Sequence, residues 1–282
     1  MTDPVLLLVA HGTRNPAGVE VIARLADSVS AALAESASGP LAESASGALA
    51  ESASGALADS VGEGRSESAH GVSVRVAFVD VLGPSPADVL RELPDDAPVV
   101  AVPAFLASGY HVHADLPREI TESGHRHVHV TPALGPDPAL ARVMGERLRA
   151  AGAASSDHVV LAAAGSSDVR ALADVRTAAD QLSDEMHCPV EVAYVATGEP
   201  RVADVVDAAT ASGARVVVAS YLLAPGLFHT RLGSTGAAVV TDPLGVHPGV
   251  TALIVDRYRT AVDLISAAAA RSRPDRSAPD RD

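Results

Sequence analysis

The chain has 282 residues, a formal net charge of −14, one cysteine and no lysine. The negative charge argues against a nucleic-acid partner, because basic surfaces bind phosphate. The absence of lysine excludes a pyridoxal-phosphate Schiff base and a P-loop, and the one thiol, Cys188, can make neither an internal disulfide nor a thiolate metal cage, so a reducing cytoplasm is the expected compartment.

Apolar and amphipathic stretches alternate along the first half of the chain. Four apolar runs predict buried strands, at residues 5–10, 74–79, 99–102 and 128–130. Four stretches with helical periodicity follow them, at residues 19–34, 86–93, 114–123 and 138–151. This alternation predicts a parallel sheet with helices on both faces. The first run has no basic flank, so we interpret it as a strand rather than a signal peptide, and no run reaches the about 20 residues of a membrane span.

A repetitive segment interrupts the first half. Three near-identical octapeptides begin at Leu33, Leu41 and Leu49, and a degenerate fourth copy follows. Serine and glycine recur in every copy, and the period fits neither a helix nor a heptad. We therefore predict a surface insertion over residues 35–71 that is either mostly disordered or a frayed extension of the preceding helix. The tail, residues 272–282, is predicted to be disordered.

The same pattern starts again in the second half. Four strands are predicted, at residues 159–163, 190–195, 216–220 and 238–241. Three helices are predicted, at residues 168–186, 202–211 and 249–270. Residues 131–138 and 241–248 share the spacing Thr-x-x-Leu-Gly-x-x-Pro, which an internal duplication explains. The sequence thus predicts an α/β protein of two flavodoxin-like lobes, residues 1–152 and 153–271, each with a parallel sheet of about four strands.

Two histidines follow strands of the first lobe. His11 ends the first strand, and His111 lies a short loop beyond the third. Open α/β sheets bind ligands beyond the carboxyl ends of their strands, and in a flavodoxin-like order these two strands are neighbours. We expect the two imidazoles to meet over one cleft; the alternative is that His11 caps its strand and His111 is a surface loop residue. Neutral imidazole suits Fe²⁺ or Co²⁺ and releases them more readily than thiolate, and it can also accept a proton.

Three motifs resemble the sirohydrochlorin chelatase family, the class II tetrapyrrole chelatases of siroheme and cobalamin synthesis. They are His-Gly-Thr-Arg after the first strand, Asp80 before Gly-Pro-Ser-Pro, and the run from Phe105 to Pro117. The last is the most specific, since Asp115 follows His111 by four residues and precedes Leu-Pro. The resemblance covers both halves and fails only over the insertion and the tail. It implies two lobes facing a cleft and two histidine metal ligands, one of which is also the base that takes pyrrole protons.

The resemblance implies a metal-inserting enzyme in which His11 and His111 bind the metal and carry the catalysis. The inserted metal is Fe²⁺ or Co²⁺, with iron favoured, and it is a substrate, since no permanently bound cofactor is expected. Asp80 is the candidate for a third ligand or proton relay, with a helix cap or loop carboxylate as the alternative. Eight residues besides the two histidines are expected to contact the tetrapyrrole: Asp80, Arg14, Leu106, Ala107, Ser108, Gly109, Tyr110 and His229.

A polycarboxylate substrate requires local cations in this acidic chain. The candidates are Arg14, Arg118, Arg231 and protonated histidines, together with the backbone N–H groups of residues 108–110. The second lobe has Ala-Ala-Gly where the first has Ala-His-Gly, so one metal site is expected, in the first lobe. His229 is then either a substrate contact or structural.

A second function class stays open at this point. His125, His127 and His129 alternate, so a strand would place them on one face, as in a non-catalytic metal-binding or metallochaperone protein. The alternative for this run is a solvated strand entry. A cleft with His11 and His111 converging favours the chelatase, whereas metal held at the three-histidine run favours the carrier. An α/β oxidoreductase is disfavoured, because dinucleotide and phosphate motifs are missing.

Overall fold

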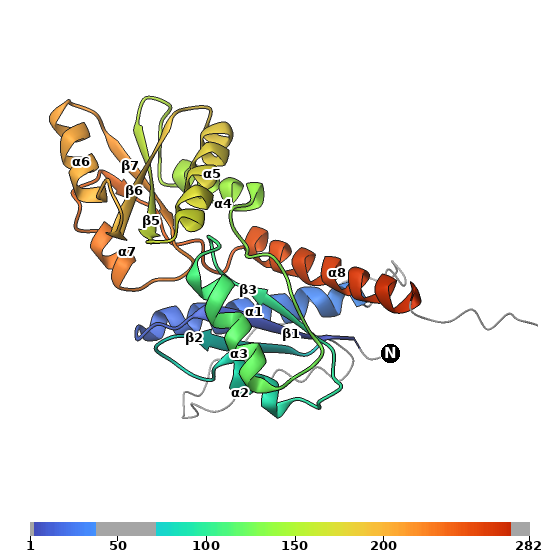
Figure 1. Ribbon diagram of the computed structural model, residues 1–282. Coiled ribbons are helices and arrows are strands. Elements are labelled where there is room, and N and C mark those ends of the chain that lie inside the picture. The colour runs from blue at the N-terminus through green and yellow to red at the C-terminus, as the bar shows by residue number, and fades with distance from the viewer. Residues whose placement is uncertain (1–2, 38–71, 272–282) are drawn as a thin grey trace, which may run out of the picture.

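The predicted strands form two parallel sheets with the same strand order. The computed structural model describes residues 3–37 and 72–271, and within these ranges each sheet has four strands (Figure 1). The first sheet, in the order β2-β1-β3-β4, contains β1 (Val5–His11), β2 (Val74–Val79), β3 (Val99–Pro103) and β4 (Val128–Val130). The second, in the order β6-β5-β7-β8, contains β5 (His158–Gly165), β6 (Val190–Thr197), β7 (Val216–Tyr221) and β8 (Val239–Val240). The predicted fold is confirmed, and β1 and β3 are neighbours.

Strand β1 is apolar up to its last residue, His11, because both faces of the strand are buried. Leu6 and Leu8 belong to one hydrophobic cluster, while Leu7 and Val9 belong to another. Successive side chains of a strand point to opposite faces of the sheet, and a parallel sheet is covered on both. Each buried side chain of this size contributes about 1.5–3 kcal/mol. Burial on both faces holds β1 inside the sheet, and the exposed His11 marks the carboxyl end of the strand.

Helices cover both sheets close to the predicted positions. They are α1 (Pro16–Ala37), α2 (Pro86–Glu92), the π-helical turn η1 (His111–Asp115), α3 (Leu116–Ser123), α4 (Pro138–Ala150), α5 (Val169–Met186), α6 (Val202–Ala211), α7 (Leu227–Leu232) and α8 (Pro248–Arg271). The helix predicted at residues 114–123 corresponds to the end of η1 and the whole of α3. Helix α7 was not predicted, because six residues are too few to show a helical periodicity. No described helix is long and apolar enough to cross a membrane.

The predicted insertion and tail fall mainly on residues that the structure does not describe. Residues 35–37 belong to α1, and the rest of the segment predicted at 35–71 lies outside the described residues. The tail at residues 272–282 lies outside them as well. Both predictions therefore stay predictions.

The two lobes exchange their last helices. Helix α4 follows the first sheet along the chain but packs against α5 and β7 of the second lobe, whereas α8 follows the second sheet and packs against α1 and β3 of the first (Figure 1). Leu140 of α4 and Ile254 of α8 are fully buried in one hydrophobic cluster that spans both lobes. The domain boundary predicted between residues 152 and 153 stays a prediction. The helices cross it, since α4 precedes the boundary but packs on the second lobe and α8 follows it but packs on the first.

Candidate metal centre

The carboxyl ends of the central strands of both sheets face one cavity between the lobes. Its volume is about 980 Å³, at the upper end of the range for small-molecule sites. Residues that follow β1 and β3 line one wall, and residues from β5, α5 and the segment from β7 to α7 line the other. The cavity is therefore built jointly by the two lobes.

His11 ends β1 at this cavity, and the glycine after it fixes its surroundings. A Cβ on Gly12 would lie 2.3 Å from the backbone oxygen of Asp80, so only glycine allows the turns after β1 and β2 to approach this closely. The Nδ1–H of His11 donates to the carbonyl oxygen of Gly12 over 2.8 Å, because a carbonyl can only accept. The proton is therefore on Nδ1, and Nε2 carries the free lone pair.

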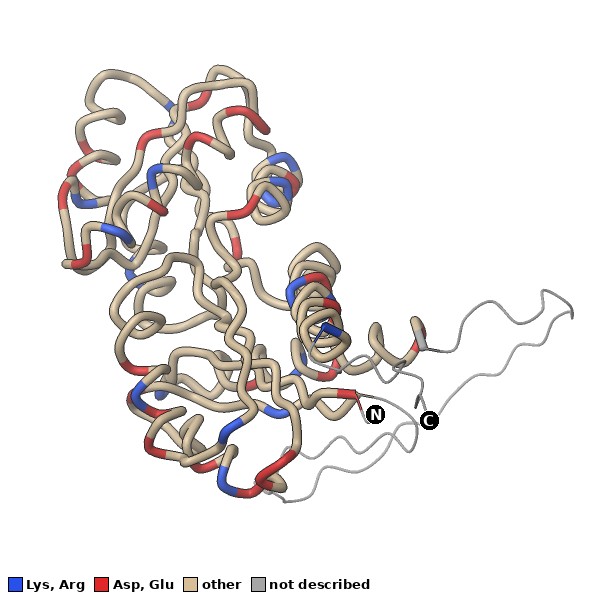
Figure 2. Tube along the Cα trace, turned by 45° about the vertical axis from the view of Figure 1, so that its right-hand side comes forward, with Lys and Arg blue, Asp and Glu red and all other residues tan. Residues whose placement is uncertain are grey.

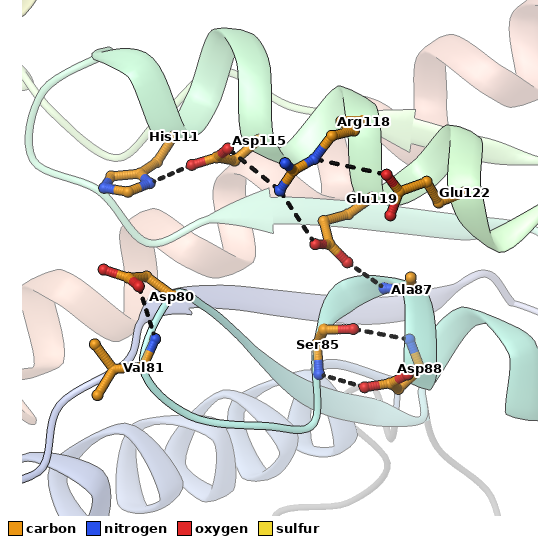
Figure 3. A network of polar contacts seen from close by, with 10 residues as sticks. All are labelled: Asp80, Val81, Ser85, Ala87, Asp88, His111, Asp115, Arg118, Glu119 and Glu122. Atoms are coloured by element: carbon orange, nitrogen blue, oxygen red, sulfur yellow. Dashed lines mark hydrogen bonds and ion pairs between the residues drawn. The ribbon is translucent and has the colours of Figure 1, made fainter.

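His111 begins η1, where the partly buried carboxylate of Asp115 holds its ring. The Nδ1–H of His111 donates to Oδ2 of Asp115 over 2.7 Å, and Arg118 contacts the other carboxylate oxygen of Asp115 at 3.4 Å (Figure 3). Arg118 also contacts Glu119 and Glu122 (Figure 3). A carboxylate bonded to one ring nitrogen orients the imidazole and leaves the other nitrogen to bind a metal. Nε2 of His111 is thus the available ligand atom.

The two imidazoles that were expected to meet lie side by side. The ring centroids of His11 and His111 are 4.9 Å apart with planes at 86° to one another. The ring of Phe105 stacks on His111 at 6.0 Å between centroids and supports it from the loop. Both residues line the cavity, so both imidazoles are placed where a ligand in the cavity can contact them. Their role at a metal stays a prediction.

Asp80 lies beside His11 without completing a three-residue metal site. Its Oδ2 is 3.9 Å from Nε2 of His11, and its Oδ1 accepts the backbone N–H of Val81. Asp80 and Val81 both have positive φ, 61° and 54°, a strained backbone of the kind that concentrates at functional sites. Over residues 3–37 and 72–271, no group of three or more His, Cys, Asp or Glu side chains is arranged to hold a metal ion. A third ligand is thus not supported, and Asp80 remains a candidate proton acceptor beside His11.

The three-histidine run does not form a metal site in the described part of the chain. The same absence of a three-residue group applies to His125, His127 and His129. His125 instead bonds through Nε2 to the carbonyl oxygen of Pro94 at 3.2 Å. The bond of His125 to Pro94 favours the solvated strand entry.

Six of the eight residues expected to contact the tetrapyrrole besides the histidine pair line the cavity. They are Arg14, Leu106, Ala107, Gly109, Tyr110 and His229. Asp80 and Ser108 do not line it. The Ser108 N–H donates to Asp174 and the Gly109 N–H donates to the carbonyl oxygen of Ala107, so these backbone groups are not available for carboxylates as expected. His229 donates its Nε2–H to the carbonyl oxygen of Thr241, which favours a structural role for its ring.

The cavity avoids the acidic charge of the chain. Charged residues lie mainly on outer helices and loops (Figure 2), and among the described residues no Asp or Glu lines the cavity. Arg14 lines it and is exposed. Arg118 and Arg231 do not line it, and Arg118 contacts three carboxylates, so the structure gives no support to either as a substrate contact. Among the described residues, Arg14 is thus the one arginine in the cavity lining.

A second arginine close to the cavity is engaged by its own carboxylate. The side-chain and backbone N–H groups of Arg170 donate to Asp168 and lower the pKa of that carboxyl to about 2. The carboxylate therefore stays charged at neutral pH and pairs with Arg170 at 2.8 Å. Arg14 is left as the cation best placed for an anionic ligand.

Exposed apolar side chains gather at the cavity, and sequence reasoning missed them. Leu227 and Phe228 of α7 are 62% and 36% exposed, and Val81 is 47% exposed, although all three line the cavity. Exposed apolar groups at a cavity are typical of a site for an apolar ligand surface. Residues 105–109, Phe-Leu-Ala-Ser-Gly, resemble residues 222–226, Leu-Leu-Ala-Pro-Gly. This likeness was the available signal, because it makes Leu227 and Phe228 the counterparts of Tyr110 and His111.

Replacing Asp115 tests the orientation of His111. Asp115→Ala is expected to weaken Co²⁺ binding at the histidine pair by at least about tenfold, because outer-shell carboxylates contribute 10- to 100-fold to metal affinity. Titration followed by the visible absorption of bound Co²⁺ measures the change. Glu122→Ala is the matched control, since it removes another carboxylate from Arg118 without touching His111. Equal losses in both variants would show that Asp115 acts through the charge network and not through the ring.

Comparisons with known proteins agree with this architecture. The sequence profile of the CbiX family matches residues 44–151 and 158–261. A comparison with curated proteins gave no match. Among solved structures, SirB from Bacillus subtilis with Fe³⁺ is 17% identical, with 94% of this chain and 98% of that chain covered at a TM-score of 0.68.

Two further solved structures are similar. The sirohydrochlorin chelatase SirB from Bacillus subtilis subspecies spizizenii in complex with cobalt is 17% identical, with 94% of this chain and 98% of that chain covered at a TM-score of 0.64. CbiX, the terminal enzyme for biosynthesis of siroheme in denitrifying bacteria, is 19% identical, with 91% and 99% covered at a TM-score of 0.60. At these identities the structural likeness shows a shared fold.

Proposed function

This chain belongs to the CbiX family, and on that premise we propose that it is a sirohydrochlorin chelatase, which inserts a divalent metal into a sirohydrochlorin-type tetrapyrrole in siroheme or cobalamin synthesis. One observation carries the proposal. His11 and His111 lie 4.9 Å apart between ring centroids in the wall of a cavity of about 980 Å³, each with Nδ1 committed to a hydrogen bond. Two neighbouring imidazoles, each hydrogen-bonded through Nδ1 rather than Nε2, suit a borderline metal ion that must later be given up.

The metal is a substrate of this reaction. We propose Fe²⁺ as the inserted ion, with Co²⁺ as the alternative, because imidazole suits both; the similar SirB structures contain Fe³⁺ or cobalt. Two protein ligands leave most coordination positions to the macrocycle. The absence of a three-residue metal group among the described residues is consistent with an ion that is bound only in transit.

The histidine pair also matches the proton balance of insertion. A free-base tetrapyrrole loses two pyrrole protons for each divalent ion that it gains. As the ion passes to the pyrrole nitrogens, Nε2 of His11 and Nε2 of His111 each regain a lone pair and can accept one of these protons. Asp80, whose Oδ2 is 3.9 Å from Nε2 of His11, then stabilises the imidazolium or passes its proton to solvent.

The cavity suits a flat, apolar ring with carboxylate arms. Its second-lobe wall is apolar and includes Leu172, Val175, Leu227 and Phe228. No acidic side chain among the described residues lines it, so the carboxylates of the substrate meet no like charge there. Arg14 offers the guanidinium for one of the arms.

Arg14→Gln is expected to raise the KM for sirohydrochlorin about five- to tenfold while changing kcat little. The reason is that a charge-assisted contact to a substrate arm is lost, and the loss is reduced by the exposure of Arg14. Initial rates at varied sirohydrochlorin measure it, and the effect should shrink as salt is added. Arg24→Gln removes the same charge from α1 outside the cavity lining and should leave the KM unchanged. A KM for Arg14→Gln equal to that of the control would remove Arg14 from substrate binding.

An absorbance assay tests the proposed function directly. Purified protein is mixed under anaerobic conditions with sirohydrochlorin and either Fe²⁺ or Co²⁺, and the spectrum of the metallated product is followed against the spontaneous reaction. We expect acceleration with at least one metal and a higher kcat/KM for iron. No acceleration with either ion would refute the chelatase proposal, and a higher kcat/KM for cobalt would reverse the choice of metal.

A further inference from the structure

The loop that carries His111 is held by the other lobe. This loop, residues 105–110, joins β3 to η1. The hydroxyl of Tyr221, at the end of β7, donates to the carbonyl oxygen of Leu106 over 2.7 Å. The backbone N–H of Ser108 donates to Oδ2 of Asp174 on α5, also over 2.7 Å. Both contacts cross from the second lobe to the first and fall between Phe105, which stacks on the ring, and His111 itself.

The Tyr221 contact is buried and tightly packed. Tyr221 is only 3% exposed, and burial raises the pKa of its hydroxyl, so the group keeps its proton and acts as a donor. A Cβ on Gly135 would lie 2.4 Å from the Tyr221 hydroxyl and 2.3 Å from the Leu106 oxygen, so glycine is required beside this bond. The hydroxyl therefore fixes the first half of the loop with little freedom.

The Asp174 contact fixes the second half of the same loop. Asp174 lies on the side of α5 that faces the first lobe, between the cavity-lining residues Ala171 and Val175. A Cβ on Gly109 would be 3.4 Å from Ala171, which shows how closely the loop approaches α5. A carboxylate that accepts a backbone N–H forms a stronger bond than a neutral acceptor. The loop is thus anchored at two points before His111.

We propose that Asp174 and Tyr221 are positioning residues, through which the second lobe sets the place of His111 relative to His11. The second lobe has Ala163 and Ala164 before Gly165, where the first has His11 before Gly12, so it supplies no imidazole at the corresponding strand end. Its contribution to the metal centre is made through the backbone of residues 105–110. Binding sites tolerate displacements of only about 0.5 Å, so an unanchored loop would separate the two rings. The identity of the ion that His11 and His111 bind in the cell rests on the proposed function.

The test uses loop protection and metal affinity in three variants of α5. Asp174→Ala removes the acceptor, Asp174→Asn keeps an oxygen in its place, and Asp180→Ala removes an exposed carboxylate from the same helix as the matched control. Hydrogen exchange of peptides covering residues 104–112 reports the loop, and Co²⁺ titration reports the histidine pair. Neither measurement uses a tetrapyrrole, so failure of the chelatase assay and failure of this inference are distinguishable.

We expect Asp174→Ala to speed exchange in the loop about tenfold and to weaken Co²⁺ binding about tenfold, as loss of one hydrogen bond to a charged group implies. Asp174→Asn should stay within about threefold of the wild type, since the amide oxygen still accepts the bond. Asp180→Ala should change neither quantity. Tyr221→Phe removes a single oxygen atom and should likewise speed loop exchange and weaken Co²⁺ binding. This variant provides the test if Asp174→Ala fails to fold. Unchanged exchange in residues 104–112, or faster exchange with unchanged Co²⁺ affinity, would overturn the proposal.

Discussion

His11→Ala and His111→Ala are each expected to lower the rate of enzymatic metal insertion by at least about a hundredfold. Either substitution leaves one imidazole where two ring centroids lie 4.9 Å apart. It also removes a proton acceptor, and general acid–base catalysis typically contributes about 10²- to 10⁴-fold to the rate. The absorbance assay with Fe²⁺ or Co²⁺ measures the loss. The double variant should be about as slow as either single variant, because residues that act as a unit are not additive.

The control for these variants is a histidine outside the cavity. His127→Ala removes an exposed imidazole next to β4 and should leave the rate and the Co²⁺ affinity unchanged. Circular dichroism establishes that all four proteins are folded. If His11→Ala or His111→Ala kept the wild-type rate while folded, that residue would have no place in the mechanism.

The strands and their order were predictable because burial leaves a strong mark on a parallel sheet. A strand covered on both faces is apolar at nearly every position, and the central strands β1, β3, β5 and β7 accordingly contain apolar runs of four or more residues. The histidine pair was predictable for the same reason. Because β1 and β3 are neighbours, the end of β1 and the loop that follows β3 lie at one edge of the sheet, and His11 and His111 meet there.

The pairing of helices with sheets was not predictable from the sequence. The apolar face of α4 indicates that the helix is buried, but it does not say that the partner is the second sheet, and the same holds for α8 and the first. The contacts of Tyr221 and Asp174 with the loop join residues 115 and 66 positions apart, and no local pattern marks either residue. The wall built by α7 was missed because the helix is short and its apolar side chains are exposed.

The two lobes differ at the residue before the glycine that ends or follows their first strand, which is His11 in the first lobe and Ala164 in the second. Gly12 and Gly165 both allow a close approach to the neighbouring strand end, to Asp80 in the first lobe and to Thr197 in the second. The backbone geometry of the strand end is thus kept in both lobes, whereas the imidazole is present only in the first. The second lobe retains the shape of the site and contributes a cavity wall in place of ligands.

That shared geometry makes Gly165→Ala the substitution with the largest expected effect on stability. A Cβ at this position would lie 1.8 Å from the backbone oxygen of Thr197, and the residue has a φ of +97°. Strain of the left-handed backbone and displacement of a neighbouring strand should together lower the free energy of unfolding by about 3 kcal/mol. Urea unfolding followed by circular dichroism measures this.

Gly213→Ala separates the two causes of that loss. Gly213 has a similar φ of +86°, but a Cβ there would meet nothing within 4 Å. Only the backbone strain applies, so its unfolding free energy should fall by about 1 kcal/mol. The difference between the two variants then measures the steric contact with Thr197. Equal losses would mean that the β6 end moves away from residue 165 at no cost, and that the close approach of the two strand ends is not what requires glycine at this position.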